Sequence, residues 1–174
     1  KIRVPALEDY AWRLWDYWER HLDPDLSIDR SLKGAVKGKV VMITGGSSGI
    51  GEAAAIRVAE AGGKVLVVAR DEEKLADVRK KITDAGGFVK TYSCDITDLA
   101  ANDKLAKDIL KEFGHVDVLV NNAGRSIRRS LALSYDRFHD FERTMQLNYF
   151  ACVRLTMNLL PSMTARKRGH VINV

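Results

Sequence analysis

Short apolar runs alternate with amphipathic stretches over most of the chain. The runs cover residues 40–44, 64–69, 88–93, 116–120 and 170–174. Several are apolar on both faces, as strands in a covered parallel sheet must be. The stretches between them have helical spacing, and several end at glycines that suit helix C-caps, such as Gly62, Gly86 and Gly114. This alternation predicts α/β architecture with a Rossmann-type doubly wound parallel sheet, which we expect to be truncated after the fifth strand.

The N-terminal part has a different pattern. Residues 7–22 place leucines, Ala11 and Trp18 on one face at helical spacing and contain all 3 tryptophans of the chain. Pro24 and the polar residues around it then break the pattern. We therefore expect residues 1–37 to form a Trp-rich helix and a connector, and residues 38–174 to form the α/β domain, incomplete at its C-terminus.

Composition and charge narrow the function classes. The chain is 46% hydrophobic and 29% charged, and no apolar run approaches the ~20 residues that cross a bilayer. Its first residues lack the apolar core of a secretory signal, so a cytoplasmic protein is expected. Cys94 and Cys152 lack metal-ligand spacing and are expected to be reduced thiols, with no metal site. The net charge of +5 is scattered, which argues against nucleic-acid binding and suits an enzyme whose ligands carry phosphates.

A glycine-rich turn, "TGGSSGIGEAAAI", follows the first strand and opens the first helix. Glycine allows a tight turn and close backbone approach to a pyrophosphate, while a helix N-terminus supplies free N–H groups and a positive dipole end. The serines add hydroxyl donors. An ordinary turn is the alternative, but the strand before it and the helix after it favour phosphate binding. The predicted cofactor-binding residues here are Gly45, Ser47, Ser48, Gly49, Ile50 and Gly51.

The end of the second strand bears on the choice of cofactor. A carboxylate there would accept hydrogen bonds from a ribose 2′-hydroxyl and favour NAD, but the strand ends with Ala69 and is followed by Arg70. A guanidinium can bind a 2′-phosphate through two hydrogen bonds. We predict that Arg70 selects NADP(H). The alternative is that Arg70 pairs with one of the acidic residues at 71–73.

Taken together, four motifs resemble the classical short-chain dehydrogenase/reductase family over residues 38–174. They are "TGGSSGIG", "CDITD" at 94–98, "NNAG" at 121–124 and "LNYFA" at 147–151. The resemblance implies reversible hydride transfer between a nicotinamide and a carbonyl carbon. It also implies that Asp95 binds the adenine amino group with Ile96 beside it. For Asp95 the alternative is that it caps the next helix.

The "NNAG" motif ends the fourth strand, at the sheet edge where ligands of α/β proteins bind. In the family it contacts the cofactor ribose, so Asn122, Ala123 and Gly124 are assigned to the cofactor site together with Asn121. A turn that ties strands together is a second role for the motif. Asn148 lies in a helix expected to begin near Asp136, and the resemblance makes it the catalytic asparagine, whose kinked helix holds a water on a proton relay.

The family's catalytic Ser, Tyr and Lys are expected beyond Val174. None of the tyrosines in the chain has a lysine four residues later, so no Tyr-x-x-x-Lys is present. We therefore expect the chain to be inactive alone. We expect Gly169 to end the helix of Asn148 and His170 to begin the fifth strand. In the family this helix commonly forms a dimer interface, so an exposed apolar surface and a homo-oligomer are expected.

The tryptophan helix and the segment "NNAGRSIRRSLALSYDRFHDFERTMQLNYF" resemble the C-terminal reductase half of two-domain bacterial fatty acyl-CoA reductases. This implies reduction of a fatty acyl-CoA or fatty aldehyde by NADPH, and a preceding reductase domain in the same polypeptide. Arg125, Arg128 and Arg129 are either solvated or bind an anionic part of the substrate. The alternative function is a dinucleotide-binding module or sensor without catalysis.

Overall fold

The computed structural model describes residues 7–21, 29 and 31–174. They belong to two units, with the boundary between residues 35 and 36. In the first unit, helix α1 (Leu7–His21) is the amphipathic helix predicted for 7–22, with Leu22 outside the described residues. Trp12 and Trp15 on this helix are exposed. A short helix, α2 (Leu32–Val36), lies where only a connector was predicted. Its last residue, Val36, is the first residue of the second unit and is buried in the core of that unit.

The second unit is built on a parallel sheet with strand order β3-β2-β1-β4-β5. The strands are β1 (Val40–Thr44), β2 (Lys64–Ala69), β3 (Phe88–Ser93), β4 (Val118–Asn121) and β5 (His170–Asn173). The predicted Rossmann-type fold is confirmed. Strand β4 begins two residues later than predicted, because the Asp117 carboxylate accepts the Val40 N–H at the position where the β1–β4 ladder would start.

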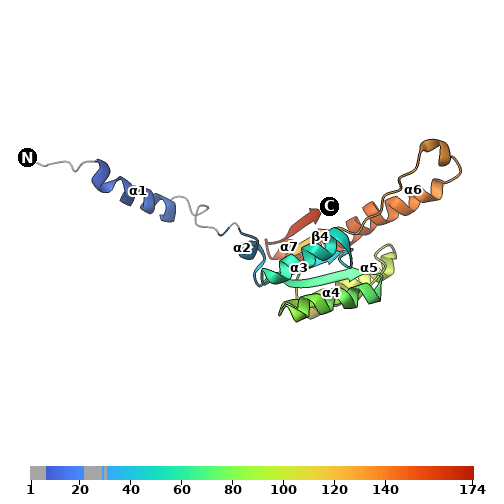
Figure 1. Cartoon of the computed structure of the whole chain (residues 1–174), viewed down its shortest axis with the longest axis horizontal. Coiled ribbons are helices and arrows are strands. Elements are labelled where there is room, and N and C mark those ends of the chain that lie inside the picture. Colours follow the sequence, from blue (N-terminus) through green and yellow to red (C-terminus); the bar gives the residue numbers. More distant parts are fainter. Residues whose placement is uncertain (1–6, 22–28, 30) are drawn as a thin grey trace, which may run out of the picture. The chain divides into compact units, whose positions relative to one another are not determined.

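Helices cover both faces of the sheet (Figure 1). Helices α3 (Gly49–Glu60) and α4 (Glu72–Asp84) pack on the face formed by residues such as Val41 and Val67. Helices α5 (Leu99–Phe113) and α7 (Cys152–Ala165) pack on the opposite face, against Met42 and Leu66. Strands β1 and β2 are apolar on both faces because helices cover each face.

The predicted glycine C-caps are confirmed for the helices that precede β2, β3 and β4. Gly62, Gly86 and Gly114 adopt left-handed backbone conformations with φ of 85°, 78° and 76°. Only glycine takes this conformation without steric cost. These glycines end α3, α4 and α5 and turn the chain back towards the sheet.

The helix that carries Asn148 is divided into three parts. It begins with α6 (Phe138–Met145), slightly later than predicted, continues as a π-helix, η3 (Gln146–Ala151), and ends as α7. A short 3₁₀ helix, η2 (Leu131–Leu133), lies in the loop before α6. In Figure 1 α6 and this loop extend beyond the end of the sheet, so α6 is joined to the core through η3.

The prediction that Gly169 ends this helix was wrong. Helix α7 ends at Ala165, and Lys167 takes the left-handed conformation with φ of 51°. The N–H groups of Lys167 and Arg168 donate to the carbonyls of Thr164 and Met163, which is the hydrogen-bond pattern of a Schellman cap. Gly169 is needed for packing instead, because a Cβ there would lie 2.6 Å from Cγ of Met163.

The predicted exposed apolar surface is present along the divided helix and β5, and β5 is an exposed edge strand that begins at His170 as expected. The exposed apolar residues are Phe138, Phe141, Met145, Tyr149, Phe150, Val153, Met157, Leu160, Val171, Ile172 and Val174.

Candidate cofactor site

The candidate site lies where the loops after β1 and β4 meet. These strands are neighbours from which the strand order runs in opposite directions, and such a switch point is where doubly wound sheets bind ligands. The Asn122 side chain joins the two loops by donating to the carbonyls of Thr44 and Gly45, at 3.1 and 3.2 Å. The Thr44 hydroxyl accepts the N–H groups of Asn122 and Ala123 at 3.1 and 3.0 Å. The loops are therefore held together before any ligand binds.

The glycine-rich turn requires glycine for two different physical reasons. Gly45 and Gly49 adopt positive φ angles of 65° and 57°. Gly51 is buried in the first turn of α3, and a Cβ on it would lie 2.4 Å from both the Asn122 amide nitrogen and the Gly45 carbonyl oxygen. The packing of α3 against the β4 loop thus depends on the absence of a side chain at 51.

The N-terminus of α3 keeps its polar groups available. Ser48 is the N-cap residue, yet its exposed side chain makes no capping hydrogen bond to the helix. Ser47 is half-buried beside it, and Ile50 is 72% exposed. Free N–H groups and a positive dipole end at a helix start are suited to a phosphate. Ser48 therefore has a hydroxyl that the fold itself does not use.

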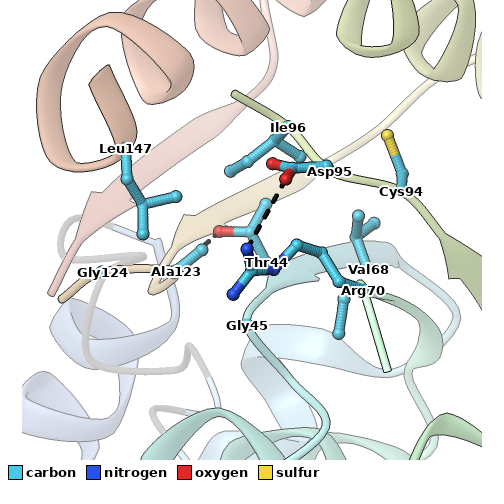
Figure 2. A pocket seen from close by; sticks show the side chains of 11 residues that line it. Thr44, Gly45, Val68, Arg70, Cys94, Asp95, Ile96, Ala123, Gly124 and Leu147 are labelled. Carbon is cyan, nitrogen blue, oxygen red and sulfur yellow. Dashed lines mark hydrogen bonds and ion pairs between the residues drawn. The ribbon is translucent and has the colours of Figure 1, made fainter. Parts of the chain in front are cut away.

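A cleft of about 130 Å³ lies beside this turn, at the ends of β1, β2, β3 and β4 (Figure 2). It is lined by Thr44, Gly45, Val68, Ala69, Arg70, Cys94, Asp95, Ile96, Ala123, Gly124 and Leu147. The structure thus brings together six of the predicted site residues: Gly45, Arg70, Asp95, Ile96, Ala123 and Gly124. Asn122 is bonded to the rim of the cleft, whereas residues 47–51 and Asn148 do not line it.

Arg70 and Asp95 face each other across the cleft, with their charged groups 3.5 Å apart (Figure 2). Burial opposes ionisation of Asp95, but hydrogen bonds from Thr97 and the charge of Arg70 outweigh it, so the pKa of this carboxyl is lowered. The alternative in which Arg70 pairs with residues 71–73 is not observed, since Asp71 caps α4 and bonds Lys74. Both charged groups of the pair thus lie at the cleft.

The helix-capping alternative for Asp95 also fails. The N-cap residue of α5 is Asp98, whose side chain accepts the N–H groups of Ala100 and Ala101. The Asp95 carboxylate accepts instead from the backbone and hydroxyl of Thr97, at 3.0 and 2.7 Å. Asp95 is 44% exposed at the cleft. One oxygen thus bonds Thr97 and the other lies beside Arg70, and the exposed carboxylate remains accessible to a ligand at the cleft.

Asn148 lies in the π-helix η3 and is bonded to the loop after β4. Its side-chain oxygen accepts the Arg125 N–H and its amide nitrogen donates to the Arg125 carbonyl, both at 2.9 Å. A Cβ built on Gly124 would lie 3.5 Å from its oxygen. Asn148 lines a second hollow, of about 490 Å³, together with Gly124, Cys152 and the end of β5. Asn148 is thus an exposed residue whose side chain is nevertheless fixed, because both of its polar atoms bond the Arg125 backbone.

The three arginines of the loop after β4, which are Arg125, Arg128 and Arg129, have different surroundings. Arg129 donates to Asp140 at 2.8 Å, and Arg137 bonds the same carboxylate at 2.9 Å. These two cations lower the pKa of Asp140, with Arg137 the larger cause. Arg128 is exposed, and Arg125 lines a hollow beside the cleft with Arg70 and Arg143. Arg129 therefore stabilises the loop and is not available to a substrate anion.

Sequence reasoning missed part of the cleft. The lining residues that were not assigned to the site are Thr44, Val68, Ala69, Cys94 and Leu147. Thr44 has a readable signal, because it is the polar last residue of an otherwise apolar strand directly before the glycine turn. Burial raises the pKa of the Cys94 thiol, so Cys94 contributes a neutral wall. Asn121 is buried and bonds Asn173 and Thr156, so the "NNAG" turn does tie strands together.

Within the described part of the chain, no group of three or more His, Cys, Asp or Glu side chains is placed to hold a metal ion. Among the same residues, none of the helices combines the length and apolar character that a membrane crossing requires.

Comparison with known proteins agrees with this geometry. The sequence model of the short chain dehydrogenase family matches residues 39–174. A fatty acyl-CoA reductase of Acinetobacter baylyi is 57% identical over 139 residues, which cover 80% of this chain and 47% of that protein. A metagenomic short-chain oxidoreductase solved with NADP is similar with a TM-score of 0.75 and 35% identity, covering 80% of this chain and 62% of the other.

A 7α-hydroxysteroid dehydrogenase solved with NADH is also similar, with a TM-score of 0.75 and 32% identity over 80% of this chain and 53% of the other. The chain spans about half the length of the curated relatives it matches, from 43% to 53% for the fatty acyl-CoA reductases and mycobacterial oxidoreductases. The match over residues 39–174, the parallel sheet and the glycine-rich switch point show that the chain belongs to the short-chain dehydrogenase/reductase family.

Proposed function

We propose that the protein is an NADPH-dependent oxidoreductase that transfers hydride to a carbonyl or acyl-thioester substrate, with a fatty acyl-CoA or fatty aldehyde as the substrate class. The proposal concerns the whole protein, since the chain spans about half of its relatives. The name of the Acinetobacter baylyi relative supports the acyl substrate. This chain contributes the cofactor half of the site.

The residues present fit a dinucleotide. The buried Gly51 leaves the α3 N-terminus close to the β4 loop, and Gly49 has open space where a Cβ would stand. Ser48 and the first N–H groups of α3 would hold a pyrophosphate, and Asp95 with Ile96 would hold an adenine. The amides of the loop 122–124 would hold the ribose next to the nicotinamide. The bound dinucleotide would supply the hydride.

The observation that carries the choice of NADP(H) is the position of Arg70 at the cleft. It is the residue directly after β2, it lines the cleft, and its side chain is 75% exposed. The strand end itself provides no carboxylate to repel a 2′-phosphate. Of the two similar structures, one holds NADP and the other NADH. The shared fold therefore does not determine the cofactor, and the residues of each chain must do so.

For the chemistry, we propose that Asn148 positions the loop beside the nicotinamide. Both polar atoms of its side chain are used by the Arg125 backbone, so the side chain holds this loop and is not free to bind substrate. The Asn148 carbonyl lies 3.2 Å from Sγ of Cys152 at the rim of the second hollow. The roles of Ser, Tyr and Lys, expected outside this chain, stay predictions.

Titration of the chain with NADPH and NADH, followed by cofactor fluorescence, tests the cofactor proposal. We expect tighter binding of NADPH, and a loss of about 10- to 100-fold in NADPH affinity for Arg70→Ala, because charge-assisted hydrogen bonds to a phosphate are removed. NADH affinity should change little. Arg79→Ala on α4, which removes an arginine that lines none of these hollows, is the control. Equal affinities of the unmodified chain for the two cofactors would refute the choice of NADP(H).

The substrate proposal is tested on the whole protein. We expect a long-chain acyl-CoA or fatty aldehyde to accelerate the loss of NADPH absorbance, and free coenzyme A to appear when the thioester is used. NADPH binding without turnover of either substrate would instead support the non-catalytic sensor.

We also propose that the whole protein is a homo-oligomer that uses the exposed apolar residues of α6, η3 and α7, and that a reductase domain precedes this one in the polypeptide. Support comes from the length of that apolar surface and from the fatty acyl-CoA reductase relatives. Sedimentation of the whole protein measures its mass, and a monomer at all concentrations would exclude the oligomer. A cytoplasmic location, expected from the sequence, stays a prediction.

A further inference from the structure

Asn102 is a fully buried polar residue in the middle of the molecule. Its side chain, on α5, is 0% exposed. Its amide nitrogen donates to two carbonyl oxygens, those of Ile96 and Ala151, both at 3.1 Å. Ile96 lies in the loop after β3, and Ala151 is the last residue of the π-helix η3. One side chain therefore joins the loop at the cofactor cleft to the end of the π-helix.

A second side-chain amide joins the same two segments. Gln146, the first residue of η3, donates from its amide nitrogen to the Thr97 carbonyl at 3.1 Å. The π-helix is thus linked to the loop 95–97 directly at its first residue, Gln146, and through the Asn102 side chain at its last residue, Ala151. We call the Asn102 and Gln146 side chains, with these three hydrogen bonds, the amide brace.

The two braced segments carry different parts of the proposed site. The loop 95–97 supplies Asp95 and Ile96 to the cleft, and Leu147 of the π-helix lines the same cleft (Figure 2). Between the ends of the π-helix, Asn148 holds the Arg125 backbone in the loop after β4. The brace therefore connects the loop 95–97 to the segment that carries Asn148.

Core packing alone does not account for Asn102. The other buried residues of α5, which are Leu105, Ala106 and Ile109, are apolar and belong to the core. The side-chain oxygen of Asn102 is buried and has no hydrogen-bond partner among the described residues. A buried acceptor without a partner destabilises the fold, and an apolar side chain at 102 would avoid that cost. What asparagine provides, and an apolar side chain would not, is the pair of hydrogen bonds donated to the Ile96 and Ala151 carbonyls.

We propose that Asn102 and Gln146 are positioning residues that couple the adenine-facing loop 95–97 to the π-helix carrying Asn148. The consequence for catalysis rests on the proposed function, whereas the coupling itself is a property of the free protein. Occupation of the cleft at Asp95 and Ile96 orders the π-helix, and loosening of the π-helix weakens binding at the cleft.

Hydrogen exchange in the free chain tests the coupling without any cofactor. Asn102→Leu removes the two bonds of Asn102 while keeping a side chain of similar size, and Gln146→Met removes the third. We expect amides in both 95–98 and 148–152 to exchange at least about threefold faster in Asn102→Leu, and amides in 95–98 to do so in Gln146→Met. Ile109→Val is the control, since it trims the same buried helix and leaves the brace intact.

Two further variants separate donated hydrogen bonds from shape. Gln146→Lys keeps a donor at 146 and should restore the wild-type exchange that Gln146→Met loses. Asn102→Asp donates one bond when its carboxyl is protonated and none when ionised, and burial raises the pKa of such a carboxyl. We expect its NADP⁺ affinity, relative to wild type, to recover at least about threefold as the pH falls from about 8 to about 5, while Asn102→Leu shows no such recovery.

The outcomes separate this inference from the proposed function. Faster exchange confined to α5, or the same changes in Ile109→Val, would overturn the brace whether or not a cofactor binds. If the brace variants behave as expected but the wild-type chain does not bind NADP(H), the coupling stands and the proposed function fails. If NADP(H) binds and its affinity is the same in Asn102→Leu as in wild type, the coupling to the cleft is refuted.

Discussion

The two ends of the parallel strands differ in how their polar groups are used. We call the side of the sheet where the strands end the carboxyl edge, and the side where they begin the amino edge. At the carboxyl edge, Ser48 occupies a helix N-cap without bonding the helix, and the Arg70 and Asp95 side chains are 75% and 44% exposed. At the amino edge, Asp117 is 15% exposed and has a partner on each oxygen. The carboxyl edge is built with donors and acceptors left for a ligand, whereas the amino edge closes its own hydrogen bonds.

The partners of Asp117 show how the amino edge is closed. One carboxylate oxygen accepts the Val40 N–H at 2.9 Å and lies 3.3 Å from His115 Nε2, and the other accepts from Arg166. Burial opposes ionisation of Asp117, but these bonds dominate and lower its pKa below the ordinary 3.8. The group thereby joins the starts of β1 and β4 to the segment after α7. Substitutions at the amino edge should accordingly change stability alone, whereas those at the carboxyl edge should change ligand binding, with or without a change in stability.

The largest effect is expected at the carboxyl edge, for Gly51→Ala. The new Cβ would stand 2.4 Å from the Asn122 amide and the Gly45 carbonyl, so the β4 loop and α3 must move apart. We expect a loss of ~3 kcal/mol in the free energy of unfolding, measured by denaturant titration. NADPH affinity should fall by about 100-fold, because close approach of the turn to the pyrophosphate is lost.

Gly86→Ala is the control for a Cβ added away from the switch point, since Gly86 has a positive φ of 78° and nothing within 4 Å of a built Cβ, whereas Gly51 has a crowded Cβ position and no positive φ. It should cost about 1 kcal/mol of stability and leave NADPH affinity unchanged. Similar losses of NADPH affinity in the two variants would show that lost stability, rather than contact at the switch point, limits binding.

Asp117→Asn should have the second largest effect, on stability alone. It weakens charge-assisted bonds to Val40 N–H and Arg166, and we expect unfolding to become easier by about 2 kcal/mol at pH 7. Since the folded-state pKa of Asp117 is below the ordinary 3.8, its contribution is present above that pH and is lost as the pH falls through the folded pKa. The stability gap between wild type and variant should therefore close in acid.

Denaturant titrations at a series of pH values measure this gap, and NADPH titration at neutral pH should show unchanged affinity. A gap that stays constant below the ordinary carboxyl pKa, or a large loss of NADPH affinity, would contradict the separation of the two edges.

Lys167→Gly, also at the amino edge, should have a smaller effect than these and should increase stability. Among the described residues Lys167 is the one non-glycine residue with a positive φ, and glycine adopts this conformation without steric cost. We expect a gain of about 1 kcal/mol, seen as a higher thermal midpoint. Lys167→Ala keeps the Cβ and serves as the control. Equal midpoints for the glycine and alanine variants would attribute any change to the lost charge.

The smallest effect on stability is expected for Ser48→Ala. An N-cap serine usually contributes about 1 kcal/mol, but Ser48 makes no capping bond, so the change should stay within about 0.5 kcal/mol. NADPH should bind about three- to tenfold more weakly. Asp98→Ala, which removes a true cap with two bonds, should do the reverse. If Ser48→Ala lowers stability as much as Asp98→Ala, the hydroxyl does serve the helix.

The sheet and the glycine-rich turn could be predicted because local pattern determines them. Runs apolar on both faces predict buried strands, and the strand–turn–helix context of Gly45 to Gly51 restricts what the turn can do. The end of the last helix was misread for the same reason, since glycine is the usual terminator and Lys167 took that place. Glycine is required at residue 169 because a side chain there would clash with Met163, and no local sequence pattern reveals this contact.

The amide brace could not be predicted from the sequence. Asn102 and Gln146 look like ordinary polar residues of amphipathic helices, and their partners Ala151 and Thr97 are 49 residues away. The π-helix has no local signature either, since its sequence, "QLNYFA", suits an α-helix equally well. Only the resemblance of "LNYFA" to a family motif pointed to Asn148 before the structure did.

The π-helix has a consequence for how this chain tolerates changes in length. A π-helix closes i→i+5 hydrogen bonds and so accommodates one residue more than the α-helical turn that could replace it. One residue lost between 146 and 151 would let this turn close as an α-helix, so α6 and α7 would keep the faces that they present and the apolar residues of α7 would stay on the sheet. Asn148 would be displaced from the Arg125 backbone. A single deletion in this segment would therefore spare the core and lose the site.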